Sequence, residues 1–182
     1  MRVINNNFMS FEPEFLDAFH NCPYPTGIDI FPLDYVTNNK EEEAIQKELV
    51  ELVKTVADTN GQGHLKEDEL DRLLDYIEEL THQKIKREGN IKNQLYKLLT
   101  ALYALYGEED GDRIALIPQY LESGVSVYPK ECYADSVRMP FDVITIPVPM
   151  GYDGVLSRKY GDYMRNVRSG GGHDYPYFDA HD

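Results

Sequence analysis

Hydrophobic residues recur every three or four positions through the middle of the chain, at 40–57, 67–81 and 91–106. This spacing predicts three amphipathic helices that bury one face each. Two segments further along, Val125–Tyr128 and Phe141–Pro147, are instead rich in β-branched residues and predict short strands. We expect a hairpin of Val137–Phe141 against Val143–Val148. The pattern therefore predicts an α+β fold, with a helical middle segment and short strands on either side.

Before the helical segment, the apolar run from Ile28 to Phe31 predicts a short buried strand that Pro32 ends, because proline has no N–H to donate. Asp29 falls on the face opposite Ile28. A carboxylate in such a strand either caps a turn or pairs with a local arginine, or it serves a site by meeting a metal or other donors. Upstream, Ser10 precedes a predicted short helix over 11–20.

The length of 182 residues fits a single domain over 1–182. We divide it into an N-terminal helix and strand (1–39), an acidic helical segment (40–122), and a hairpin, helix and tail (123–182).

The formal net charge of −14 argues against nucleic acid or an anionic membrane as the main partner. No run approaches the ~20 apolar residues of a membrane helix, so we expect no membrane insertion. Two distant cysteines and no signal pattern favour a cytoplasmic protein.

The segment from Asp58 to Glu69 matches, position by position, the twelve-residue calcium loop of an EF-hand. Gly63 occupies the sixth position, where the loop turns sharply. The predicted ligands, in loop order, are Asp58, Asn60, Gln62, His64 through its carbonyl, and Glu69. The alternative is an ordinary helix–turn–helix corner, because Thr-Asn-Gly-Gln-Gly is good turn chemistry and no second loop is found to pair with this one.

Basic residues gather near the end of an otherwise acidic chain, at Arg158, Lys159, Arg165 and Arg168. From the charge pattern alone, one interpretation is that they pair with the acidic middle of the protein.

Several motifs, taken in order, give the chain a resemblance to a known family. The first is Gly27-Ile-Asp-Ile-Phe-Pro-Leu-Asp34. The later ones are Val127-Tyr-Pro-Lys-Glu-Cys132, Met139-Pro-Phe-Asp142, Ile146-Pro-Val-Pro149, Gly151-Tyr-Asp153, Leu156, Tyr160-Gly-Asp-Tyr-Met164 and Gly172-His-Asp-Tyr-Pro-Tyr-Phe178. Together they resemble the LicD family, which includes bacterial phosphocholine transferases and is related to fukutin-type phosphoribitol transferases.

The resemblance implies a partial nucleotidyltransferase-like fold and a phosphotransferase activity. Phosphocholine or a similar phospho-group would move from a CDP-linked donor to a cell-surface glycan, as in lipopolysaccharide or teichoic acid modification. It implies a divalent metal, Mg²⁺ or Mn²⁺, with Asp29 as the first candidate acid and Asp34 as the second. Arg158, Lys159 and Arg165 would then meet the donor phosphates.

One part of the family pattern, a Gly-rich helix start followed by an aspartate cluster, has no counterpart in residues 1–26. That cluster supplies most of the family's metal ligands. We therefore expect a truncated enzyme that is weakly active or inactive alone. The alternative is a non-enzymatic binding or structural module, with calcium at 58–69 as one form of it.

A truncated sheet would leave the strand at Ile28–Phe31 with an open edge, which is a template for pairing with another chain. We predict that the protein covers this edge by forming a homodimer or by exchanging strands. Light scattering over a range of concentrations measures this directly, and a clean monomer at high concentration would count against it.

Overall fold

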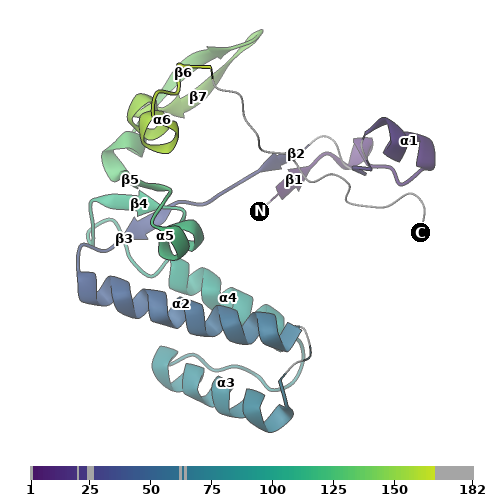
Figure 1. Cartoon of the computed structure of the whole chain (residues 1–182), viewed down its shortest axis with the longest axis vertical. Helices are drawn as coiled ribbons and strands as arrows, with labels where there is room; N and C mark the ends of the chain where they lie inside the picture. The colour runs from purple at the N-terminus through teal and green to yellow at the C-terminus, as the bar shows by residue number, and fades with distance from the viewer. Residues whose placement is uncertain (1, 20, 24–26, 62, 64, 167–182) are drawn as a thin grey trace. The chain divides into compact units, whose positions relative to one another are not determined.

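A computed structural model describes residues 2–19, 21–23, 27–61, 63 and 65–166 of the chain (Figure 1). The chain forms two compact units. The first contains Met1–Pro32 and Tyr163–Asp182, and the second is Leu33–Asp162. The expected division of one domain at residues 39 and 122 does not coincide with these limits.

The first unit holds a two-stranded antiparallel sheet in which β1 (Arg2–Ile4) pairs with β2 (Gly27–Asp29). Between them lie the 3-10 helix η1 (Asn6–Phe8) and the short helix α1 (Pro13–Ala18). α1 is shorter than the predicted 11–20. Pro13 occupies its first turn, where the missing N–H costs no hydrogen bond.

The prediction of a buried strand from Ile28 to Phe31 is wrong. The strand ends at Asp29, and the side chains of Ile28 and Phe31 are 71% and 64% exposed. Alternation along a strand indicates which residues share a face, but burial needs another layer to cover that face. A sheet of two three-residue strands does not supply one.

The second unit is built on three helices, which confirm the three predicted from the hydrophobic pattern. They are α2 (Lys40–Gly61), α3 (Glu67–Thr81) and α4 (Ile91–Tyr103). α2 and α4 lie side by side, and α3 packs against α2 (Figure 1). Their buried faces make up most of the core, which includes Val53, Val56, Leu74, Ile77, Leu95 and Leu99.

One polar side chain lies inside this core. Gln46 on α2 is 1% exposed, and its Nε2 donates to the carbonyl oxygen of Leu102 at 2.8 Å. Leu102 lies in the last turn of α4, where backbone carbonyls have no partner within the helix. The hydrogen bond therefore satisfies both buried groups and fixes α2 against the end of α4.

Short strands lie on either side of the three helices in the sequence, as predicted. β3 (Asp34–Val36), β4 (Arg113–Ala115) and β5 (Val127–Pro129) form an antiparallel sheet in that order. The helix α5 (Ile117–Ser123) joins β4 to β5, and the 3-10 helix η2 (Lys130–Tyr133) follows. The predicted hairpin is confirmed as β6 (Ser136–Phe141) and β7 (Ile144–Pro149), and α6 (Tyr152–Tyr160) comes after it.

Mixed helices and small antiparallel sheets agree with the α+β class. None of the helices in the described part of the chain is long and apolar enough to cross a membrane.

The Glu78 carboxylate makes several of the contacts that hold the connection between α3 and α4. Its Oε1 accepts from the N–H of Ile85 and from Arg87, each at 2.8 Å, and its Oε2 accepts from Lys84 at 2.7 Å. Ile85 is a core residue, so these bonds fix where the connection enters the core. The hydrogen bonds from Lys84 and the Ile85 N–H lower the pKa of Glu78 from 4.5 to about 2.

We predict that Glu78→Gln lowers stability at pH 7 and that this loss shrinks in acid. A carboxyl group whose folded pKa is depressed contributes stability above its ordinary pKa, and that contribution is lost as pH falls from about 4.5 towards 2. Urea unfolding of both proteins at pH 7, 4.5 and 3 measures the difference. Glu79→Gln, a change at the exposed neighbour, is the control and should match the wild type. A difference that does not change with pH would contradict this account.

Candidate functional site

The residues that the sequence singled out for a site are divided between the two units. Asp29 and Arg165 belong to the first unit. Asp34, Arg158 and Lys159 belong to the second. Within the second unit, the structure brings Arg158 and Lys159 into one pocket, and we take this as the candidate site.

The pocket has a volume of about 500 Å³ and lies between the last turn of α6 and the segment that joins α5 to β5. We call it the basic pocket. α6 contributes Arg158, Lys159 and Tyr160. The facing side is lined by Gln119, Gly124, Val125, Ser126, Val127 and Tyr128.

The wall opposite α6 is fixed by local backbone geometry. Gly124 ends α5 with a φ of +73°, a left-handed conformation that suits glycine. Ser126 also has a positive φ, of +60°. Its Oγ donates to Oε1 of Gln119 at 2.7 Å, and its carbonyl accepts from the N–H of Leu116 at 3.0 Å. These bonds tie the turn back onto the first turn of α5.

Aromatic side chains supply much of the remaining lining. Tyr128 is 6% exposed and packs against Tyr133, with ring centres 5.9 Å apart. Tyr160 is exposed, and the Nζ of Lys159 lies 5.4 Å from the centre of its ring. The pocket therefore combines two cations with aromatic surface.

The cations of the basic pocket are not neutralised by the acidic helices. Within the described residues, neither Arg158 nor Lys159 forms a hydrogen bond or an ion pair with a carboxylate. Both occupy the last turn of α6, where the helix dipole favours positive charge. The described part of the chain therefore does not show Arg158 or Lys159 paired with the acidic middle segment.

α6 is held in place by a close backbone contact. The N–H of Gly151 donates to the carbonyl of Cys132 at 3.0 Å. A β-carbon at residue 151 would lie 2.5 Å from the Cα of Cys132, closer than real atoms approach. Only glycine lets the start of α6 come this near to η2, and this approach positions the helix that carries Arg158.

Asp34, the second candidate acid, lies on β3, where it is paired in register with Ala115. Burial raises the pKa of its carboxyl group. Asp29, the first candidate, is the last residue of β2 in the other unit. Both roles stay predictions.

The calcium loop predicted at 58–69 does not have the expected limits. α2 continues through Gly61, so Asp58 and Asn60 lie in a helix, and only residues 62–66 join α2 to α3. Asp58 Oδ1 accepts a hydrogen bond from the hydroxyl of Tyr96 at 2.6 Å. Glu69 is exposed in the first turn of α3. Gln62 and His64 lie outside the described residues. The calcium site stays a prediction. The extension of α2 through Asp58 and Asn60 does not favour it, because these two residues lie in a helix and not in a loop.

Among the residues that the structure describes, no group of three or more His, Cys, Asp or Glu side chains is placed to hold a metal ion.

Several residues of the basic pocket were not found from the sequence. Gln119 and Ser126 lie more than thirty positions before Arg158 and carry no motif. Tyr128 falls within the motif Val127–Cys132, but the sequence indicates no role for it. A side-chain hydrogen bond joins Gln119 to Ser126, and the packing of α6 against η2 brings Arg158 to the same cavity.

Comparison with known proteins identifies no relative: no family model, no curated protein and no solved structure matches the chain.

We predict that Gly151→Ala destabilises the protein by about 1–3 kcal/mol, the usual cost of forcing an extra carbon into a packed contact. Urea unfolding measures the change. The control is Gly154→Ala, where a β-carbon would lie 3.7 Å from the Cys132 Sγ, an ordinary contact. Inside a helix this second change should be neutral or slightly stabilising. Equal losses in the two variants would refute the close-contact explanation.

Proposed function

We propose that the chain takes part in a LicD-type phosphotransfer, in which phosphocholine or a similar phospho-group passes from a CDP-linked donor to a cell-surface glycan. In this proposal the basic pocket binds the diphosphate of the donor, and the second unit forms part of a nucleotidyltransferase-like fold. The single observation that carries it is that Arg158 and Lys159 line one cavity and, within the described residues, form no ion pair with a carboxylate, in a chain of net charge −14.

The chemistry of the two side chains suits a diphosphate. The planar guanidinium of Arg158 matches two phosphate oxygens at once, and the ammonium of Lys159 acts as a compact point charge. The exposed ring of Tyr160 offers flat apolar surface for a base or a ribose. A volume of about 500 Å³ falls in the range of small-molecule pockets.

Two motifs of the LicD resemblance contribute residues to this pocket. Val127–Cys132 supplies Val127 and Tyr128, and Tyr160–Met164 supplies Tyr160. Part of the cavity lining therefore comes from the motifs that carry the resemblance. This is the second observation that supports the proposal.

The proposal is limited to donor binding. Mg²⁺ or Mn²⁺ would be expected in such a transfer, but the described residues offer no set of ligands that fits an ion, so we derive no metal-dependent step. Weak or absent activity of the chain alone stays a prediction.

We predict that the protein binds CDP-choline through charge contacts at the basic pocket. Isothermal titration should show affinity for CDP-choline and for CDP, and weaker affinity for cytidine, because the diphosphate provides the contacts. Arg158→Ala and Lys159→Ala should each weaken CDP-choline binding about tenfold, the usual effect of losing one charge-assisted contact. Binding should also weaken at 0.5 M salt, where the Debye length falls to about 4 Å.

Lys97→Ala is the matched control, because Lys97 is exposed on α4 and does not line the basic pocket. It should leave the titration unchanged. Equal affinity for cytidine and CDP-choline, or wild-type affinity in the double variant of Arg158 and Lys159, would reject the site. Turnover of CDP-choline by the chain alone would refute the expectation of weak activity.

A further inference from the structure

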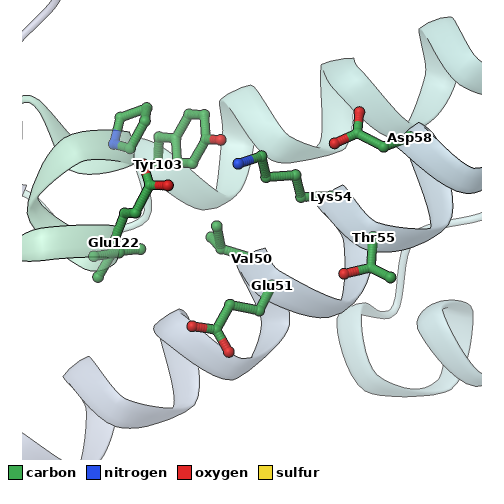
Figure 2. Close-up of a pocket in the computed structure, with 9 residues that line it drawn as sticks. Val50, Glu51, Lys54, Thr55, Asp58, Tyr103 and Glu122 are labelled. Carbon is green, nitrogen blue, oxygen red and sulfur yellow. The ribbon is translucent and has the colours of Figure 1, made fainter.

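A second pocket, of about 340 Å³, lies among α2, α4 and α5 (Figure 2). We call it the mixed-charge pocket. Its apolar lining includes Val50 of α2 and Leu121 of α5, which are 4% and 7% exposed. Tyr103 of α4 adds a half-buried ring. Nothing in the donor-binding proposal uses this cavity.

Charged groups of both signs line the same cavity. Lys54 of α2 extends toward the Tyr103 end of the pocket, and Glu122 comes from α5 (Figure 2). Within the described part of the chain, neither forms a hydrogen bond or an ion pair, with the other or with a third residue. An ammonium and a carboxylate thus line one pocket without neutralising each other.

The other two carboxylates of the pocket already have partners. Asp58 accepts from the Tyr96 hydroxyl at 2.6 Å, and Glu51 lies 3.9 Å from the Nζ of Lys47. Asp58 also contributes, after burial, to raising the pKa of Tyr103, so the phenol stays protonated at neutral pH. The groups left to meet a ligand are therefore Lys54, Glu122 and the neutral ring of Tyr103.

We infer that the mixed-charge pocket binds a small zwitterion with an apolar body, of the class of an α-amino acid with a large side chain. The ligand ammonium pairs with Glu122 and the ligand carboxylate pairs with Lys54. The side chain lies against Val50, Leu121 and Tyr103. The volume is sufficient for a ligand of this size.

Ligands of a single charge fit less well. A simple amine leaves Lys54 without a partner, and a simple carboxylic acid leaves Glu122 without one. A phosphate-rich ligand meets three carboxylates and one ammonium in the lining, so the net charge opposes it.

Three probes with the same phenethyl body separate these cases: L-phenylalanine carries both charges, phenethylamine only the cation, and 3-phenylpropionate only the anion. Isothermal titration of the full chain should show the tightest binding for phenylalanine. Losing one charge-assisted contact weakens binding about tenfold, so each single-charge probe should bind at least tenfold more weakly.

Two nearly isosteric variants assign the contacts. Glu122→Gln should weaken phenylalanine and phenethylamine about tenfold and should not weaken phenylpropionate. Lys54→Met keeps the aliphatic stem, so it should weaken phenylalanine and phenylpropionate about tenfold and should not weaken phenethylamine. Glu48→Gln and Lys97→Met, at exposed positions outside the pocket, are the matched controls.

Thermal unfolding followed by circular dichroism verifies that each variant is folded, and phenylalanine should raise the midpoint of the wild type more than that of either pocket variant. Phenethylamine binding as tightly as phenylalanine, with Lys54→Met unchanged, would overturn the zwitterion assignment. Absence of saturable binding of all three probes, or equal losses in the control variants, would overturn the site itself.

Discussion

The arrangement of the second unit depends on one network of charged and polar side chains, formed by Glu43, Arg113 and Tyr120. Arg113 on β4 donates to Glu43 Oε2 at 3.1 Å and to the Tyr120 hydroxyl at 3.0 Å, and that hydroxyl donates to Glu43 Oε1 at 2.6 Å. Burial raises the pKa of Glu43, but these hydrogen bonds and one from Lys40 outweigh it and hold the pKa below its ordinary value. The network joins a strand to two helices, and each charge in it has a partner.

Because Tyr120 fixes α5, its neighbours in sequence are directed to different surroundings. Successive helical residues point about 100° apart. Gln119 consequently lines the basic pocket, while Leu121 and Glu122 line the mixed-charge pocket. A helix of seven residues thereby serves as a wall for two cavities of different charge. A change that weakens the Glu43–Arg113–Tyr120 network should disturb both cavities together, whereas a change within either pocket acts on one.

The sequence was sufficient to predict those helices and strands whose buried residues recur at regular spacing and whose packing partners are close in the sequence or in the core. The helices at 40–61, 67–81 and 91–103 and the hairpin at 136–149 follow from the spacing of apolar residues, because each has one face against the core or a sequence-adjacent partner. The strand around Ile28 was misjudged because alternation does not reveal whether another layer covers it. The limits of the 58–69 loop were misjudged because turn residues at Asn60 and Gly61 did not stop α2. Arg158 and Lys159 stood out as cations in an acidic chain, but Gln119 and Ser126 share a cavity with them through the packing of α6 against η2, which the sequence does not display.

A net charge of −14 does not determine what the individual pockets bind. At physiological ionic strength the Debye length is about 8 Å, so carboxylates beyond that distance act only weakly on a ligand in the basic pocket. What matters there is that no described carboxylate pairs with Arg158 or Lys159. In the mixed-charge pocket, Lys54 and Glu122 likewise form no ion pair with any residue that the structure describes. In both pockets, ligand preference depends on the charged side chains that have no partner among the described residues. Such a side chain can form a new ion pair with a ligand without first breaking an existing one.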